Sequence, residues 1–153
     1  MAILPLLTKA EAIVAKILPS SLASLALRVA LAVPFFRSGL TKWEGFGQIS
    51  ESALFLFSDE FKLHVFGRVI DYPMPTLAAY GAGIGELAFP ILIVLGIATR
   101  FAALGLLLMT AVIQLTVPDG WPIHLTWAAM ALGIIALGAG KISIDYLLNQ
   151  TRN

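Results

Sequence analysis

The chain has 153 residues, of which 59% are hydrophobic and only 12% are charged, and it contains no cysteine. An ordinary soluble domain is about 25% charged, so this chain has too little charge to cover its own surface in water. The formal net charge of +1 provides no basic field to attract nucleic acid. The lack of cysteine excludes disulfides, thiolate chemistry and cysteine-ligated metal centres. The composition predicts a small integral membrane protein.

The first element is expected at residues 8–18, ahead of any membrane span. Thr8 and Glu11 have the spacing of a capping box, and apolar residues recur at helical intervals up to Leu18. Lys9 and Lys16 fall outside the apolar stripe, where lipid phosphates would lie. This pattern predicts an N-terminal amphipathic helix in the membrane interface.

Four stretches are long and apolar enough to span a membrane. A spanning helix needs about 20 apolar residues to cross a hydrocarbon core near 30 Å thick. Residues 22–40, 76–98, 101–117 and 121–139 meet this requirement. The last three are joined by very short links, which force them to be antiparallel neighbours. The predicted fold class is therefore all-α, with the whole chain, 1–153, forming one integral membrane up-down four-helix bundle.

The long connection at residues 43–75 has a mixed composition. It is rich in large apolar residues but is interrupted by Ser58-Asp59-Glu60. Such a segment is too polar to span a bilayer and too apolar to extend freely into water. We expect one or two short helices that lie on the outer membrane surface and pack over the mouth of the bundle.

The distribution of basic residues predicts the orientation in the membrane, because cytoplasmic loops are enriched in Lys and Arg. With the N-terminus inside, five basic residues are cytoplasmic: Lys9, Lys16, Arg100, Lys141 and Arg152. Three are then outside: Lys42, Lys62 and Arg68. Both termini are accordingly predicted to be cytoplasmic.

Five polar side chains fall within the predicted spans, where an unpaired ionisable group is costly. They are Arg28, Arg37, Glu86, Gln114 and His124. Depths counted along the helices place Glu86 within about 2 Å of the bilayer centre, and place Arg37, Gln114 and His124 in the outer half. We therefore expect a polar cluster that binds a ligand or exchanges protons. Arg28 is the predicted partner of Glu86, because Arg37 is close enough to the interface to snorkel.

Each of these residues also has a structural interpretation. A buried Arg–Glu pair can simply fix helix register, Gln114 can bond two helices together, and His124 can act as an interface anchor. No metal site is expected, since Asp59, Glu60 and His64 supply too few ligands. No cofactor is evident, although a quinone could occupy the polar cluster.

Several motifs, taken in their order along the chain, resemble the DoxX family. They are Arg28…Phe36-x-x-Gly39-x-x-Lys42, Gly85-Glu86-Leu87, Leu95-Gly96-x-x-Thr99-Arg100-x-Ala102-Ala103-Leu104, and the ending from Gly138 to Leu148. The likeness covers most of residues 22–148. It implies a four-helix protein of the bacterial inner (plasma) membrane. It also marks Arg28, Lys42, Glu86, Arg100 and Asp145 as matches to recurring charged positions of the family.

Three functions remain as alternatives. The family's association with terminal and thiosulfate:quinone oxidoreductases, and with oxidative-stress or metal-handling operons, implies a membrane subunit of a quinone-linked redox or stress-response system. The second alternative is a non-catalytic scaffold that docks through Phe55, Phe57 and Phe61. A small proton-linked transporter is the third, and it is less favoured because no inverted repeat is visible.

The expected partners are the lipid bilayer and either another protein or further copies of the chain, and no nucleic acid. Whether the chain is itself an enzyme is left open.

Overall fold

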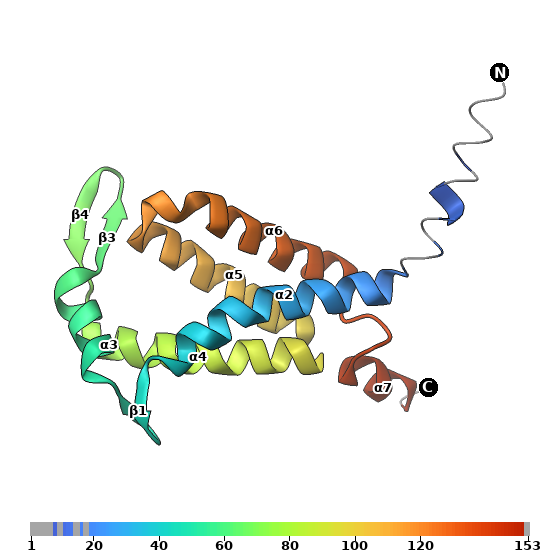
Figure 1. Cartoon of the computed structure of the whole chain (residues 1–153), viewed down its shortest axis with the longest axis horizontal. Coiled ribbons are helices and arrows are strands. Elements are labelled where there is room, and N and C mark those ends of the chain that lie inside the picture. Colours follow the sequence, from blue (N-terminus) through green and yellow to red (C-terminus); the bar gives the residue numbers. More distant parts are fainter. Residues whose placement is uncertain (1–7, 9–10, 14–15, 17–18, 152–153) are drawn as a thin grey trace.

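Four long helices form an elongated bundle in the computed structural model, which describes residues 8, 11–13, 16 and 19–151 (Figure 1). The helices are α2 (Ser20–Leu40), α4 (Pro75–Leu95), α5 (Thr99–Thr116) and α6 (Trp121–Leu137). Each is long and apolar enough to cross a membrane, the last when it is counted from Pro118. The predicted all-α membrane bundle is confirmed, with every helix end within three residues of its expected position.

The predicted interfacial helix at residues 8–18 lies largely outside the described residues. Thr8, residues 11–13 and Lys16 are described, and all of them are helical. The remaining positions of that segment stay a prediction.

Local backbone signals fix the ends of the spans. Pro75 stands in the first turn of α4, where its missing N–H leaves no helical hydrogen bond unmade. Gly96 ends the same helix with φ +70°, a left-handed conformation that glycine adopts without strain. Only two residues follow Gly96 before α5 begins at Thr99, so the second and third spans are antiparallel, as the short link predicts.

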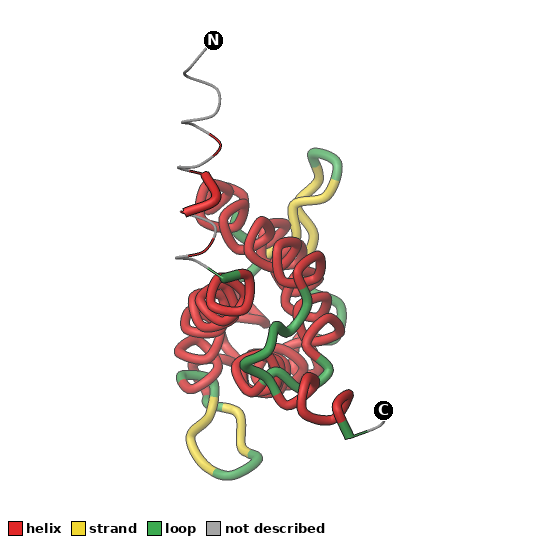
Figure 2. The backbone as a smooth tube through the Cα atoms, turned by 90° about the vertical axis from the view of Figure 1, so that its right-hand side faces the viewer, coloured by secondary structure: helices red, strands yellow, loops and turns green. Residues whose placement is uncertain are grey.

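The four spans are arranged in a ring when the bundle is viewed along its axis (Figure 2). Helix α2 packs against α4 and α6, and α5 packs against the same two helices on the other side. Leu31, Ile93, Leu106 and Ile134, one from each helix, are fully buried where the helices meet. The outward faces carry exposed apolar side chains, as expected for helices surrounded by lipid.

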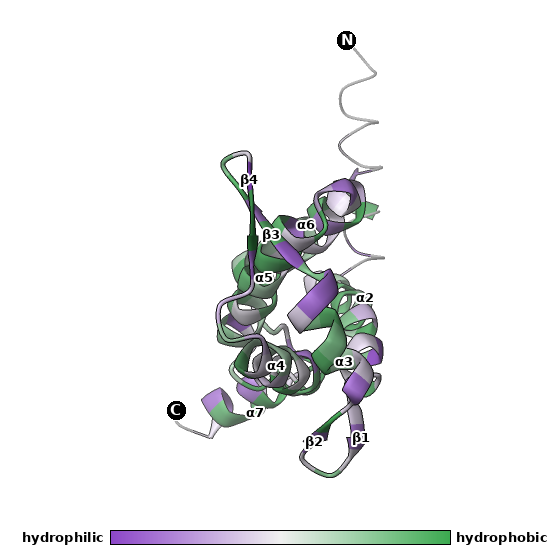
Figure 3. Ribbon diagram, turned by 90° about the vertical axis from the view of Figure 1, so that its left-hand side faces the viewer, coloured by the Kyte–Doolittle hydropathy of each residue, from purple (hydrophilic) through white to green (hydrophobic). Residues whose placement is uncertain are grey.

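Residues 43–72, which we call the cap, cover one end of the bundle (Figures 1 and 3). The cap contains β1 (Trp43–Gly45), β2 (Gln48–Ile49), the short helix α3 (Glu51–Phe55), the π-helical turn η1 (Leu56–Glu60), β3 (Lys62–Val65) and β4 (Arg68–Asp71). The expected surface helix is present as α3 and η1. The strands are a correction, because they form two antiparallel hairpins, β1–β2 and β3–β4, in place of further helix.

The opposite end of the bundle carries the start of α2 and a short helix that was not expected, α7 (Ile144–Gln150) (Figure 1). Ser143 caps α7 by accepting a hydrogen bond from the backbone N–H of Tyr146. The start of α2 and α7 therefore lie at the same end. That this end is cytoplasmic remains a prediction from the basic residues.

Candidate functional site

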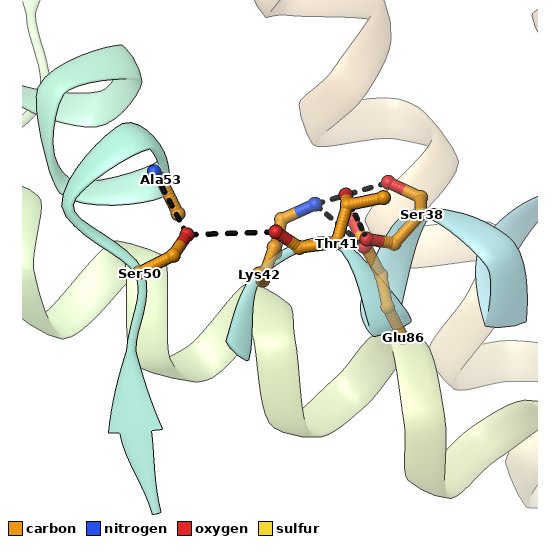
Figure 4. A network of polar contacts seen from close by, with 6 residues as sticks. All are labelled: Ser38, Thr41, Lys42, Ser50, Ala53 and Glu86. Atoms are coloured by element: carbon orange, nitrogen blue, oxygen red, sulfur yellow. Dashed lines mark hydrogen bonds and ion pairs between the residues drawn. The ribbon is translucent and has the colours of Figure 1, made fainter. Parts of the chain in front are cut away.

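A buried ion pair joins α2 to α4 beneath the cap (Figure 4). The Lys42 Nζ atom lies 2.6 Å from Oε2 of Glu86, and it also donates to Oγ of Ser38 at 3.0 Å. Lys42 lies just past the last residue of α2, and its N–H still donates to the Gly39 carbonyl at 3.2 Å, so this final turn keeps its side chain close to that of Ser38, four residues earlier. The two side chains of the pair are only 13% and 7% exposed, so a charged group of each sign is held away from bulk water.

Gly39 lets the two helices approach closely at this level. A Cβ atom on Gly39 would lie 2.8 Å from Cδ2 of Leu87 and 3.0 Å from the carbonyl oxygen of Glu86. Such contacts require a shift of α4 backbone, and only glycine avoids them. In the motif Gly39-x-x-Lys42, the glycine thus lets α2 approach α4 closely, and the lysine then reaches Glu86 on α4.

The start of the cap is tied to the same turn of chain. The Ser50 N–H donates to the Lys42 carbonyl at 2.8 Å, and Ser50 Oγ donates to the Thr41 carbonyl at 3.4 Å. Ser50 Oγ in turn accepts from the Ala53 N–H at 3.2 Å and so caps α3 (Figure 4). The ion pair and the first helix of the cap are consequently positioned by one short network.

A cavity of about 470 Å³ lies between the spans and the cap, with the ion pair in its wall. Ala78, Ala82 and Glu86 line it at four-residue spacing, which spans about 12 Å along α4. Most of the lining is apolar, and its aromatic side chains come from two spans, α2 and α6, and from the cap: Phe35, Phe57, Phe61, Tyr72 and Trp127. The cavity is therefore an apolar chamber with one charged, hydrogen-bonding region.

A second polar contact, between Tyr72 and Thr116, lies in the lining of this cavity. Thr116 Oγ1 donates to the Val112 carbonyl at 2.9 Å, so its hydrogen bond with the Tyr72 hydroxyl must have Tyr72 as the donor. His64 Nδ1 lies 3.2 Å from the Leu115 carbonyl on the same helix end. These contacts fasten the strand pair β3–β4 to the end of α5.

The cavity wall presents polar atoms that a ligand could use. Among the described residues, the Glu86 carboxylate accepts one side-chain hydrogen bond, from Lys42 to Oε2, which leaves Oε1 available to a ligand. The Tyr72 hydroxyl oxygen keeps lone pairs free while it donates to Thr116. A molecule with an apolar body and a hydrogen-bonding headgroup matches this lining, because few precisely placed polar groups in an apolar pocket are typical of small-molecule sites.

The structure corrects the predicted partner of Glu86. Arg28 lies near the opposite end of α2, fourteen residues or about 21 Å along the helix from Lys42. Its guanidinium is fully buried and donates to the carbonyl of Ile142, while Nε and Nη1 have no partner among the described residues. Arg28 is held by the C-terminal segment, and the prediction that it pairs with Glu86 was wrong.

Asp145 anchors that segment to the turn between α4 and α5. Its carboxylate accepts from the N–H groups of Ala98 and Thr99, both at 2.9 Å, and from the Thr99 hydroxyl at 2.8 Å. Its own N–H donates to the Gly96 carbonyl at 2.8 Å. Burial by itself raises the pKa of the Asp145 carboxyl, but the bonds from Thr99 and Ala98 and the charge of Arg28 outweigh it, so the pKa lies below its usual range. Asp145 therefore acts as a charged cap for the start of α5.

Gln114 and His124 meet each other but lie apart from the ion pair. His124 Nδ1 is 2.8 Å from Oε1 of Gln114, and Gln114 Nε2 donates to the Pro118 carbonyl at 3.0 Å. Because the amide nitrogen is used by Pro118, its oxygen accepts from His124, and the imidazole is held with its proton on Nδ1. Both side chains line a second pocket, between α5 and α6.

Two arginines complete the set of predicted positions. Arg37 is exposed in the last turn of α2, where a long basic side chain can reach the lipid headgroups. Arg100 is exposed at the start of α5, with its guanidinium against the backbone of Gly138. The expected single cluster is thus divided among four places, and only Glu86 lines the large cavity.

The fold and this site define a four-span membrane protein with a capped, amphipathic cavity at one end. Comparison with protein-family models matches residues 23–119 to DoxX, which is more than half of the chain. The chain belongs to the DoxX family. An uncharacterized protein from Haemophilus influenzae is 32% identical to it over 143 residues, which cover 86% of each chain. No solved structure matches the chain significantly.

Several residues of the cavity were not foreseen as part of a site. Lys42 was marked as a family position without a partner, and Tyr72, Thr116 and Trp127 were not singled out as site residues. The four-residue spacing of Ser38 and Lys42 was a usable signal, since it places a hydroxyl beside the amine on one helix face. Nothing local indicates that Thr116 meets Tyr72, because these residues belong to separate elements 44 positions apart.

Proposed function

We propose that the chain is a membrane subunit of a quinone-linked redox system, and that the capped cavity binds the quinone headgroup. The observation that carries this proposal is the buried Lys42–Glu86 pair in the wall of an otherwise apolar and aromatic-lined cavity. A volume of about 470 Å³ falls within the usual range for sites of small organic ligands, about 300–1,000 Å³.

The chemistry of the wall suits a molecule with polar atoms at both ends of a planar ring. Lys42 can donate to a quinone carbonyl, and the free oxygen of Glu86 can accept a proton from a quinol hydroxyl. The Tyr72 hydroxyl lines the same cavity, and we assign to it the contact with the second oxygen of the ring. Oxidation of a quinol releases two protons and two electrons. One proton passes to Glu86, the second passes to water at the membrane surface, and a partner protein with an oxidised redox centre takes both electrons.

The lining also provides for the apolar parts of a quinone. Phe35 and Trp127 pack with ring centroids 5.0 Å apart, and Phe57 contacts Phe61 and Tyr72 edge-on at 5.3 Å each. Aromatic walls of this kind favour flat, polarisable ligands.

Binding of a short-chain quinone to the purified protein tests this proposal. We expect the Glu86→Gln and Lys42→Met variants to bind at least about tenfold more weakly, because each removes a charged hydrogen bond. Asp59→Asn, on the exposed face of η1, is the matched control and should bind like the wild type. Unchanged affinity in both Glu86→Gln and Lys42→Met would overturn the proposal.

The scaffold alternative is less well supported by the cap. It expected Phe55, Phe57 and Phe61 to form an exposed docking surface. Phe57 is buried and Phe61 is half-buried, and both line the cavity, whereas Phe55 alone is exposed. Two of the three side chains are thus better placed to contact a bound ligand than a protein partner.

A further inference from the structure

Both hairpins of the cap end in the same dipeptide. Phe46-Gly47 joins β1 to β2, and Phe66-Gly67 joins β3 to β4. Glycine is expected at the second position of each turn, because Gly47 and Gly67 have φ +73° and +75°. Phenylalanine is not expected at the first position, where small polar residues are usual. The repeated choice of an aromatic residue therefore calls for an explanation outside turn chemistry.

Neither aromatic ring contributes to the packing of the chain. The exposed fraction is 111% for Phe46 and 101% for Phe66, the highest among the large apolar residues described. Phe66 also has φ +49°, a left-handed conformation that is unfavourable for a bulky side chain. Each ring leaves an apolar area in contact with water at a cost of about 25 cal/mol per Å². A stabilising contact for these rings must come from outside the chain.

The hairpins project sideways beyond the ring of helices, in two different directions (Figures 2 and 3). The spans run along the bundle axis, so that axis is the membrane normal. Segments that reach sideways at the end of the spans must then lie over the lipids next to the bundle. Arg37, exposed in the last turn of α2, marks the headgroup level only six residues before Trp43 begins the first hairpin.

The charges of the hairpins fit the same location. Glu44 accepts the Glu51 N–H at 3.0 Å, and Asp71 is paired with Lys62 at 2.7 Å. The charge of Asp71 is therefore balanced within its hairpin, and the carboxylate of Glu44 is hydrogen-bonded within the cap. Arg68, directly after the Phe66-Gly67 tip, is exposed and makes no ion pair in the described part of the chain. A free cation beside an apolar tip matches the lipid phosphate above the acyl chains.

We propose that the Phe46 and Phe66 tips insert into the headgroup–acyl boundary of the adjacent leaflet and anchor the cap to the lipid. The helical part of the cap, α3 and η1, lies between the two hairpins in sequence. Two lipid anchors therefore hold it at both ends over the cavity. The proposal depends on the spans and the hairpins alone and does not rest on quinone binding.

Site-directed spin labelling tests the proposal directly, since a chain without cysteine can be labelled at one introduced position. The variants are Phe46→Cys and Phe66→Cys, with Asp59→Cys on the exposed face of η1 as the matched control. Each carries a nitroxide and is reconstituted into vesicles of phosphatidylethanolamine and phosphatidylglycerol. These substitutions should leave the fold intact, because the replaced side chains are exposed.

We expect the labels at positions 46 and 66 to be more accessible to oxygen, which concentrates in lipid, than to a water-soluble nickel chelate. The label at position 59 should show the reverse order. Tip labels that are as accessible to the nickel chelate as the control would overturn the proposal. Tip labels shielded from both reagents would also overturn it, since they would indicate a protein contact between copies of the chain.

Discussion

Lys42 directs its ammonium group inward to Glu86, although Lys42 lies beyond the last residue of α2. A lysine near a membrane interface ordinarily extends outward to water. Here Ser38 and Glu86 provide two acceptors within 3.0 Å of the Lys42 amine, and the lysine side chain is only 13% exposed. The consequence is a pair whose two charges depend on each other, because neither has another charged partner among the described residues.

We expect Lys42→Met to lower the free energy of unfolding by about 3 kcal/mol, because Glu86 is left buried without a partner. The double variant Lys42→Met with Glu86→Leu should lose less than Lys42→Met does, since no charge then remains buried. Thermal unfolding in one detergent, followed by circular dichroism, measures both. If the double variant loses as much unfolding free energy as the two single variants together, the two charges do not depend on each other.

The close approach of α2 and α4 makes Gly39 a sensitive position. We expect Gly39→Ala to destabilise the bundle by about 1–3 kcal/mol, because its Cβ would lie 3.0 Å from the Glu86 backbone. Gly81→Ala is the control on α4, where a Cβ meets nothing within 4 Å. That change should be neutral or stabilise the helix by up to about 1 kcal/mol. Equal unfolding midpoints for the two variants would argue against a tight contact at Gly39.

Stability should fall in acid because of Asp145. The pKa of its carboxyl is lowered in the folded protein. The ionised carboxylate therefore stabilises the fold at pH values above the ordinary pKa of about 3.9. This stabilisation is lost as the pH falls from that value toward the lowered pKa of the folded protein. Asp145→Asn should unfold more readily at neutral pH and lose less stability on acidification. Unfolding midpoints of the two proteins across that pH range check the prediction. Parallel curves for both would show that another group is responsible.

His124 should depend on the absence of a side chain at position 120. A Cβ on Gly120 would lie 2.5 Å from Cε1 of His124, so Gly120→Ala is expected to displace the ring and break its 2.8 Å contact with Gln114. The nitrogen chemical shifts of His124 report the tautomer, and they should change from an Nδ1-protonated form to a mixture. His64 serves as the internal reference in the same spectrum. An unchanged His124 signal in Gly120→Ala would refute the prediction.

The four spans could be predicted from the sequence because each is a long apolar stretch with short or recognisable links. The partners of the polar residues could not be predicted in the same way. Depth counted from the middle of each span placed Arg28 within reach of Glu86, but it took no account of a C-terminal segment that folds back onto α2. A carbonyl such as that of Ile142 leaves no signal in the side-chain pattern.

The hairpins of the cap were missed for a different reason. Two-residue turns ending in glycine, between short runs rich in β-branched residues, are a known hairpin signal, and Phe66-Gly67 between Val65 and Arg68 fits it. The abundance of large apolar residues in 43–75 led to a prediction of one or two short surface helices and of no strand. Register and turn chemistry identify these strands better than overall hydrophobicity does.

The contact between Arg28 and Ile142 also sets an order of events during synthesis. The two residues are 114 positions apart, and ribosomes add about 5–20 residues per second, so Arg28 is made roughly 6–23 s before its acceptor exists. During that interval the first span carries an unpaired arginine, which opposes its stable residence in lipid. We therefore expect the nascent first span to stay beside water or the insertion machinery until the segment that carries Ile142 has been made.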